Sequence, residues 1–360
     1  MKLRLGLSVL SVLCILSLRP TLAREWTDSG NRKAEAELVR VDGASVVLKK
    51  PGGKVVSVPL STLSKADHQF LAEDAVRQGK LAFEKLPAFE KEDFDLAVTC
   101  FNEAIRIKLD YADAYFNRGK AYSFKGMSDK AFADYNEAIR LDPKHAKAHN
   151  NRGNIYFDTG EYDKSFADYN EAIRLDPKFA MAYANRGNIY FNKGEYDKSF
   201  ADCTEAIRLD PKLALAYIGR GMAHHYKGGF DKAIEDYTEA IRLDPKLANA
   251  YNNRGSAYLN KDEYDKVISD CTEAIRLDPK HAGAYTNRGT AYLYKGEYDK
   301  VISDCNEAIR LDPKNDIAYA SRGVAYQKRG ERDKAAAAFA EAKRLRLEKS
   351  KERSRSYPGE

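Results

Sequence analysis

The sequence has few of the side chains from which catalytic centres are built. Its 360 residues include five cysteines and six histidines. It contains no glycine-rich loop of the kind that cradles a phosphate, and no serine or cysteine in a nucleophile signature. An enzyme would need a cleft whose titratable groups have strongly perturbed pKa values. The sequence therefore favours a protein that is not an enzyme and that uses no cofactor.

A strong net charge is also missing from the body of the chain. The formal charge is +6, but Lys2, Arg4 and Arg19 supply +3 and the residues from Lys343 onward supply +4, so 6 − 3 − 4 leaves −1 for residues 24–342. A nearly neutral body cannot follow a phosphate backbone. We therefore expect no nucleic-acid partner, and interpret the basic end as a solvated helix rather than a nucleic-acid arm.

Long apolar runs are absent except near the start of the chain. Residues 1–23 have a basic beginning, an apolar run from Leu5 to Leu18, and small residues at Thr21-Leu22-Ala23. This pattern is typical of a secretory signal, and the run is shorter than the roughly 20 residues that a membrane span needs. We predict an exported protein, periplasmic or secreted, with no membrane span after cleavage. The alternative is a membrane anchor formed by the uncleaved segment.

What the chain does contain is a 34-residue unit that returns down most of its length. Apolar residues at spacings of three, four and seven occur twice in each unit and predict two helices. A short turn such as Thr159-Gly160-Glu161 separates them, and Leu175-Asp176-Pro177 ends the second. One hairpin cannot bury its own apolar face, whereas a stack can, so the repeat predicts a solenoid. The units begin at Ala112, Ala146, Ala180, Ala214, Ala248, Ala282 and Asp316.

Small residues at repeat positions 8, 20 and 27, with aromatic residues at 4, 11 and 24, predict that the two helices approach closely. The glycines expected at the closest approaches are Gly153, Gly187, Gly221, Gly255 and Gly289. This Gly-Tyr-Ala-Phe-Pro spacing resembles the tetratricopeptide repeat. The resemblance covers residues 112–349 in seven copies and implies a mainly α fold, a right-handed α-solenoid of helix hairpins.

The flanks of the seven units depart from the pattern. Residues 73–111 form a degenerate first repeat, with Ala97, Phe101 and Ala104 at positions 20, 24 and 27 and six extra residues around Pro87. No proline ends the last unit, so its final helix should continue from Lys343 to Arg355. Residues 350–360 are predicted to be a charged tail whose last five residues lack structure.

Residues 24–72 have a different character. Short β-branched runs at 36–41, 45–48 and 55–58, separated by glycine-containing turns, predict strands of a small β module, and Ser64 should cap a short helix through Leu71. Arg24, Trp26-Thr27-Asp28, Gly52-Gly53-Lys54, Val58-Pro59-Leu60 and Leu63-Ser64 with Asp67 resemble Sla-homology domain one. That resemblance implies an SH3-like fold that binds Asn-Pro-Phe peptides. A purely structural module is the alternative.

The cysteines and histidines are interpreted as structural. Equivalent positions of neighbouring repeats should lie on the order of 10 Å apart, beyond the reach of a disulfide, so we expect free, buried thiols. His145 and His149 have a metal-chelating spacing, but His149 replaces the aromatic residue of position 4, and we predict no metal. The cysteines at position 24 are Cys203, Cys271 and Cys305.

Arginine at position 7 recurs in all seven units, and aspartate at position 23 accompanies it in six. Both positions lie beside the predicted core, so the sequence predicts a repeated, partly buried ion pair. We interpret it as structural; ligand binding is the alternative. The residues are Arg118, Arg152, Arg186, Arg220, Arg254, Arg288 and Arg322, with Asp134, Asp168, Asp202, Asp236, Asp270 and Asp304.

Asparagine recurs on the first helices, which in tetratricopeptide stacks line the concave surface. This ladder is similar to the one by which the repeats of some glycosyltransferases hold an extended peptide. An amide both donates and accepts, so it pairs with a peptide backbone whatever the side chains are. Gly219 should break the ladder, and recent duplication of the repeats is the plain alternative. The predicted peptide-binding residues are Asn117, Asn150, Asn151, Asn154, Asn185, Asn188, Asn252, Asn253 and Asn287.

The sequence thus predicts an exported interaction scaffold that binds protein or peptide partners through its concave groove. The main alternative is an adaptor for carbohydrate or the envelope surface. In that case Phe124, Tyr226 and Tyr294 would supply stacking planes.

Overall fold

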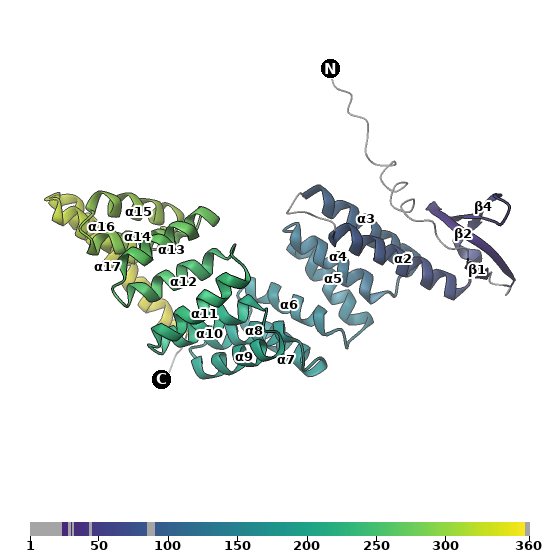
Figure 1. Ribbon diagram of the computed structural model, residues 1–360, viewed down its shortest axis with the longest axis horizontal. Helices are drawn as coiled ribbons and strands as arrows, with labels where there is room; N and C mark the ends of the chain where they lie inside the picture. Colours follow the sequence, from purple (N-terminus) through teal and green to yellow (C-terminus); the bar gives the residue numbers. More distant parts are fainter. Residues whose placement is uncertain (1–23, 28–29, 31, 43–44, 85–90, 357–360) are drawn as a thin grey trace, which may run out of the picture. The chain divides into compact units, whose positions relative to one another are not determined.

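A computed structural model of the chain describes residues 24–27, 30, 32–42, 45–84 and 91–356 (Figure 1). The predicted signal segment 1–23, the extra residues around Pro87 and residues 357–360 lie outside these ranges. The described part of the chain contains no helix long and apolar enough to cross a membrane. The elements before the first helix are β1 (Arg24–Thr27), β2 (Lys33–Asp42), β3 (Ser45–Lys49), β4 (Val55–Pro59) and the 3-10 turn η1 (Leu60–Thr62).

The helices follow one another in antiparallel pairs, as the doubled apolar pattern predicted. They are α2 (Lys65–Glu84), α3 (Lys91–Ile107), α4 (Ala112–Phe124), α5 (Ser128–Leu141), α6 (Ala146–Asp158), α7 (Tyr162–Leu175), α8 (Ala180–Asn192), α9 (Tyr196–Leu209), α10 (Ala214–Tyr226), α11 (Phe230–Leu243), α12 (Ala248–Leu259), α13 (Tyr264–Leu277), α14 (Ala282–Tyr294), α15 (Tyr298–Leu311), α16 (Asp316–Lys328) and α17 (Arg332–Ser356).

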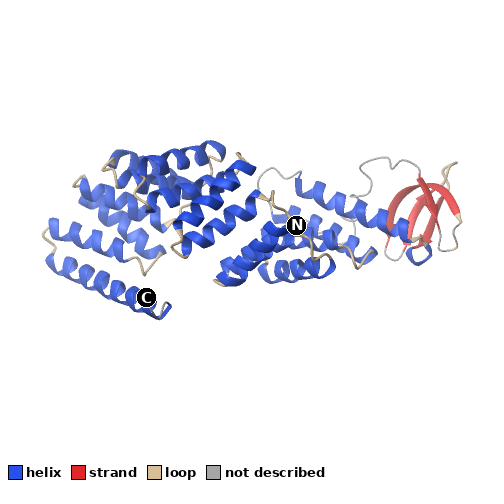
Figure 2. Cartoon of the chain, turned by 90° about the horizontal axis from the view of Figure 1, so that it is seen from below, coloured by secondary structure: helices blue, strands red, loops and turns tan. Residues whose placement is uncertain are grey.

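The β module is a four-stranded antiparallel meander in the order β1-β2-β3-β4 (Figure 2). The three predicted strands are confirmed, and β1 is an addition that the sequence pattern did not reveal. Trp26 is buried, donates its indole N–H to the Ala36 carbonyl at 3.0 Å, and meets Phe70 of α2 edge-on. Burial of one large ring thereby joins the sheet to the helix that follows it.

Four residues of the Sla-homology signature meet where β1 touches the start of α2. Buried Asp67 accepts hydrogen bonds from the Arg24 guanidinium, the Thr27 backbone N–H and the Ser64 hydroxyl, each at 2.8 Å. The Ser64 hydroxyl also accepts from the Asp67 backbone N–H at 3.2 Å, which confirms the predicted cap. Because its donors come from both β1 and the residue that caps α2, the Asp67 carboxylate fixes the position of the strand relative to the helix.

The prediction of a short helix ending at Leu71 is wrong, because α2 continues to Glu84. Its second half packs against α3, where Gly79 lies so close to Phe101 that a Cβ would meet the ring at 2.6 Å. The same helix therefore covers the sheet with its first half and packs on α3 with its second. Leu71 is interior to the helix because apolar spacing continues through Val76.

In the pairs from α4–α5 to α16–α17, each turn between the two helices has a residue with positive φ. Glycine supplies it in six turns, for example Gly160 at φ +80°, while Asp262 takes this conformation at φ +58° in the turn after α12. Between one pair and the next, the residue before proline is extended, as at Asp142 with φ −133°. That geometry ends the second helix of each pair.

Close approach of the paired helices is confirmed at four of the five predicted glycines, Gly153, Gly187, Gly221 and Gly255. A Cβ on Gly153 or Gly221 would lie 2.7 Å from the ring of Tyr169 or Tyr237, and one on Gly187 would lie 2.8 Å from Cys203 Sγ. The approach is looser at Gly289, where the nearest atoms are 3.4 Å away. In the core, the glycine backbone of one helix thus packs directly against a tyrosine ring or a cysteine sulfur of the other helix.

The described helices fall into two compact units, residues 1–177 and 178–360. The first contains the β module and helices α2 to α7, and the second contains α8 to α17. In the second unit the last helix runs 25 residues to Ser356, which confirms the expected extension beyond Lys343. Asp316 anchors this extension by ion pairs with Arg346 and Lys349 at 3.0 and 2.5 Å.

Candidate functional site

The nine predicted asparagines all lie on the first helices of their pairs, but they are not equally accessible. Asn117 is 7% exposed and donates to the Asp113 carbonyl of its own helix at 2.6 Å. Asn150 is 2% exposed and donates to Asn151 Oδ1 at 3.2 Å. These two amides are buried in this structure, so neither offers a surface for a ligand.

In the first unit, the other two predicted asparagines contact tyrosines of position 24. Asn151 Nδ2 lies 3.4 Å from the hydroxyl of Tyr135, which belongs to the preceding repeat. Asn154 Oδ1 accepts a hydrogen bond from the Tyr169 hydroxyl at 2.8 Å. Position 6 therefore lies at the boundary between repeats, beside position 24 of the repeat before it.

In the second unit, three predicted asparagines form a chain across a repeat boundary. Asn287 of α14 donates to Asn252 Oδ1 of α12 at 3.0 Å, and Asn252 donates to Asn253 Oδ1 at 3.4 Å. Asn185 is partly exposed and Asn188 is exposed on α8. The structure thus brings together three members of the predicted ladder.

Gly219 interrupts the asparagines of position 6 for a packing reason. A Cβ there would meet Cys203 Sγ of the preceding repeat at 2.6 Å. Because Cys203 is also pressed against Gly187, the two glycines enclose the thiol from both sides. An asparagine at 219 would displace that sulfur. Close packing against Cys203 therefore explains why the row of asparagines is interrupted here.

The predicted ion pairs between positions 7 and 23 are confirmed in six repeats. In the fifth repeat Arg254 donates Nε and Nη2 to the two carboxylate oxygens of Asp270, each at 2.8 Å. The arginine also reaches the repeat before it, since Nη1 donates to Thr238 Oγ1 at 3.1 Å. The same three contacts recur for Arg118, Arg152 and Arg288, with an asparagine or threonine as the second partner.

That second contact was missed at the sequence level, although a signal for it exists. Position 25 is asparagine or threonine in every repeat that precedes an arginine, as at Asn136, Thr238 and Asn306. Arg322 of the last repeat keeps its contact with Asn306 at 2.7 Å, but Ala338 stands where the aspartate would be. Within the described residues its buried Nε has no hydrogen-bond partner.

One of these ion pairs also contacts a histidine. His149 Nδ1 lies 3.2 Å from Asp168 Oδ1, and Nε2 lies 3.2 Å from the Pro143 carbonyl oxygen. Burial acts to raise the pKa of Asp168, but the hydrogen bonds from Arg152 and His149 outweigh it and lower the pKa. At Asp134, which has no such histidine, burial wins and raises the pKa. No cluster of metal-binding side chains occurs among the residues that the structure describes.

Aromatic rings of position 13 lie exposed near the turns. Phe124, Tyr226 and Tyr294 are 54%, 63% and 65% exposed. Tyr294 stacks on Tyr264 of the preceding repeat with ring centroids 4.9 Å apart and planes 10° apart. Phe124 stacks on Phe94 and Tyr226 on Tyr196 in the same way, so part of each ring is already covered.

Comparison with known proteins identifies both parts of the chain. Models described as TPR repeat match residues 88–126, 153–194 and 221–262, and models described as tetratricopeptide repeat match 112–145, 134–167, 180–213, 248–281 and 282–315. The chain belongs to the tetratricopeptide repeat family. A model of SLA1 homology domain 1 matches residues 18–78, which agrees with the cluster around Asp67.

Solved structures show the same fold for this tetratricopeptide repeat protein. It is similar to the APC/C hetero-tetramer Cut9-Hcn1 at 18% identity and a TM-score of 0.62, over 78% of this chain and 56% of that one. A tetratricopeptide repeat protein from Parabacteroides merdae ATCC 43184 has 18% identity and a TM-score of 0.52, over 71% and 99%. MamA is 31% identical over 46% of this chain and 96% of its own, with a TM-score of 0.40. The search of curated proteins found no match.

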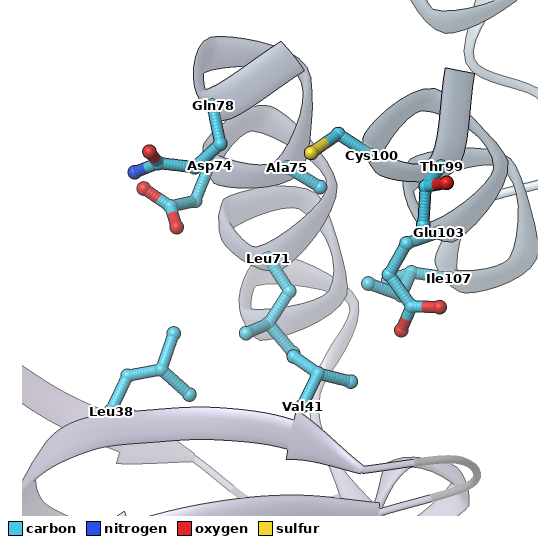
Figure 3. A pocket seen from close by; sticks show the side chains of 10 residues that line it. All are labelled: Leu38, Val41, Leu71, Asp74, Ala75, Gln78, Thr99, Cys100, Glu103 and Ile107. Atoms are coloured by element: carbon cyan, nitrogen blue, oxygen red, sulfur yellow. The ribbon is translucent and has the colours of Figure 1, made fainter. Parts of the chain in front are cut away.

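A small pocket of the tetratricopeptide repeat protein opens where the β module meets the first helix pair (Figure 3). Its volume is about 80 Å³, and β2, α2 and α3 line it with mainly apolar side chains. Buried Asp74 at its edge is paired with Arg77. Burial, with added repulsion from Asp74 and Glu103, raises the pKa of the Cys100 thiol to about 12. The pocket therefore contains no activated nucleophile.

The four described cysteines are free and buried, as predicted. Burial raises the pKa of each thiol to about 12, as at Cys203 and Cys271. We expect slow alkylation of the native protein and rapid alkylation after unfolding, because only the thiolate reacts. Mass spectrometry without added reductant should show Cys100, Cys203, Cys271 and Cys305 all modified in the unfolded chain. A disulfide-linked Cys271–Cys305 peptide would contradict this assignment.

Proposed function

We propose that this tetratricopeptide repeat protein is a non-enzymatic scaffold that binds an extended polypeptide along its first helices. One observation carries the proposal. Among the described residues, Asn253 Nδ2 and Asn287 Oδ1 have no hydrogen-bond partner, although Asn252 links the two side chains. One amide therefore offers a donor and the next an acceptor, which is what an extended peptide backbone requires. Tetratricopeptide folds are generally built for protein partners, which supports the same conclusion.

The internal amide contacts favour a peptide that is recognised by its backbone. Asn252 holds Asn253 and Asn287 in place before any ligand arrives, so less side-chain entropy is lost on binding. Since main-chain groups are the same in every peptide, recognition of this kind tolerates many sequences. Asn185 and Asn188 add to the proposed surface of the second unit, and Asn151 and Asn154 would offer one of the same kind in the first unit. Buried Asn117 and Asn150 would act only by positioning their neighbours.

We place the scaffold in an exported compartment, periplasmic or secreted. The support is the basic, apolar and small-residue order of residues 1–23. Retention of that segment as an anchor is the alternative. Mass spectrometry of the N-terminus after expression in an exporting host distinguishes the two, because cleavage would place Arg24 first.

The test of the peptide surface is a variant in which Asn151, Asn185, Asn253 and Asn287 are all alanine. A partner captured from an envelope extract should bind this full-length variant at least about tenfold more weakly in fluorescence anisotropy, because four backbone hydrogen bonds are lost. Circular dichroism should remain that of the parent, since these side chains lie outside the apolar core.

The matched control replaces four glutamates of the second helices by alanine: Glu137, Glu171, Glu239 and Glu273. These residues pair only with arginines three positions later on the same helix. The control should bind the captured partner like the parent. Equal affinity of the asparagine variant and the parent would exclude the first helices as the site and leave the β module as the candidate.

A second candidate function, adhesion to carbohydrate or the envelope surface, is favoured by the exposed rings of Tyr226 and Tyr294. Stacking on sugar faces suits such rings. Replacing both tyrosines by alanine would abolish this binding but leave capture of a polypeptide by the asparagines intact.

A further inference from the structure

A glutamate and a lysine form an ion pair at the start of the second helix in five repeats. The glutamate stands at position 16 and the lysine at position 19. In each case the lysine also lies over the tyrosine of position 11, with Nζ between 4.9 and 5.5 Å from the ring centroid. The pairs are Glu161–Lys164, Glu195–Lys198, Glu263–Lys266, Glu297–Lys300 and Glu331–Lys334.

The fourth repeat keeps the lysine but has lost both of its partners. Gly229 stands at position 16 and His224 at position 11. No hydrogen bond or ion pair involves the Lys232 side chain within the part of the chain that the structure describes, although a carboxylate contacts the lysine in each of the five repeats that have the glutamate. Lys130 of the first of the seven repeats, where Met127 stands at position 16, also has no carboxylate partner among the described residues, but it keeps its place over Tyr122. The His224 ring meets Phe200 edge-on at 5.0 Å, as Tyr156 meets Phe132 at the equivalent positions.

The backbone at this place is unchanged. Gly229 has φ −84° and ψ 62°, and Glu161 has φ −83° and ψ 58° at the same position. Both residues donate their backbone N–H to the carbonyl five residues earlier, at 2.9 and 2.8 Å. The fourth repeat therefore has the backbone geometry of its neighbours at this position but lacks the side chains of the glutamate and the tyrosine.

A cavity of about 590 Å³ opens at this place, lined by the α10–α11 turn, the start of α11, Phe200 and Lys261. Two of its lysines are already neutralised, since Lys227 pairs with Asp197 and Lys261 pairs with Asp231. Lys232 then contributes one positive charge with no counterpart. The cavity combines that charge with the apolar surfaces of Phe200 and Phe230.

We propose that this cavity binds an acidic side chain, aspartate or glutamate, of a partner protein. The incoming carboxylate takes the place that glutamate occupies in five of the six other repeats and pairs with Lys232, while its methylene groups contact Phe230. A single uncompensated lysine suits a monoanionic carboxylate better than a phosphate, which carries nearly two charges and would need a second unpaired cation. The site lies at a turn and does not depend on the asparagines of the first helices.

The test uses the full chain with ¹³C-labelled lysine and two tripeptide probes, acetyl-Ala-Glu-Ala-amide and acetyl-Ala-Gln-Ala-amide. The glutamyl probe should shift the Lys232 Cε–Hε signal in a saturable titration. The glutaminyl probe should leave it in place, as should inorganic phosphate at matched ionic strength. The Lys232→Gln variant, which lacks the signal, assigns it. The signals of Lys198 and Lys266, whose glutamates are present, serve as internal controls.

Two substitutions at one residue separate charge from volume. Gly229→Glu should restore the Glu–Lys ion pair of five other repeats. Because the introduced carboxylate would then pair with Lys232, the glutamyl probe should bind at least about tenfold more weakly. Gly229→Gln fills a similar volume without the charge and should weaken binding less. The circular dichroism of both variants should match the parent, because Glu161, Glu195, Glu263 and Glu297 already have this backbone conformation.

Three results would overturn the proposal. One is a Lys232 signal that does not respond to the glutamyl probe, and another is an equal response from Lys266. The third is a response to phosphate but not to the probe, which would assign the cavity to a different ligand. Unchanged affinity in the four-asparagine variant leaves this site standing, because none of its residues belongs to the cavity.

Discussion

Replacing Asp270 by alanine should destabilise the second unit by about 3 kcal/mol, because it leaves the partly buried Arg254 guanidinium without its carboxylate. The Arg254 side chain is 17% exposed and that of Asp270 8%, so water can replace few of the hydrogen bonds that the carboxylate makes with the guanidinium. Urea unfolding followed by circular dichroism measures the change. The loss should exceed that for a typical surface substitution several-fold.

The matched control removes the other carboxylate of the same helix. Glu273 pairs with Arg276 at the surface, where the pair is exposed to solvent. Glu273→Ala should therefore leave the unfolding midpoint unchanged within error. A double variant, Arg254→Met with Asp270→Leu, should recover most of the lost stability, since no charge remains buried. If Asp270→Ala unfolds like Glu273→Ala, the repeated pair has no structural role.

Gly187→Leu should lower the free energy of unfolding by about 1–3 kcal/mol through overpacking. The Cβ alone would meet Cys203 Sγ at 2.8 Å and the Ser199 carbonyl oxygen at 3.3 Å, and the backbone oxygen cannot move aside. Because Gly219 confines the same sulfur from the next repeat, the strain should also reach that boundary. Thermal unfolding of the variant measures the loss.

Gly289 supplies the control, because its surroundings are looser. A Cβ there would make contacts of 3.4 Å or more, which is ordinary packing. Gly289→Ala should therefore be tolerated or slightly stabilising, since alanine favours a helix over glycine by about 1 kcal/mol. Thermal unfolding of Gly187→Leu that matches the parent, or equal losses in both variants, would refute the close-packing explanation.

The repeat made most of the helical architecture predictable from sequence. A single residue type marks each kind of boundary. Proline, as at Pro177, ends the second helix of a pair, and glycine, as at Gly160, allows the positive φ of the turn between the two helices. The length of α2 was not predictable in the same way. Local apolar spacing continues through Val76, but the contact of the second half of α2 with Phe101 joins residues that are distant in the sequence.

The candidate site was predicted less completely, for a similar reason. Composition and spacing placed nine asparagines on the first helices, but spacing does not distinguish an amide that is buried from one that is open. Asn117 turns back to its own helix, and Asn252 bonds to a neighbouring repeat. Lys232 is the opposite case, because its unpaired state follows from Gly229 alone and is visible once the repeats are aligned.

The arginine of position 7 also limits how such a chain can change in length. Five of these arginines, such as Arg288 with Thr272, join their own repeat to a residue 16 positions earlier. A recombination event that inserts or removes 34 residues within the second unit returns every arginine to an equivalent partner, whereas any other length separates them. The last repeat is excluded from this exchange, since Ala338 leaves Arg322 without its carboxylate. Growth of the array would therefore occur in its interior, by whole units, while the terminal repeat stays in place as a fixed end.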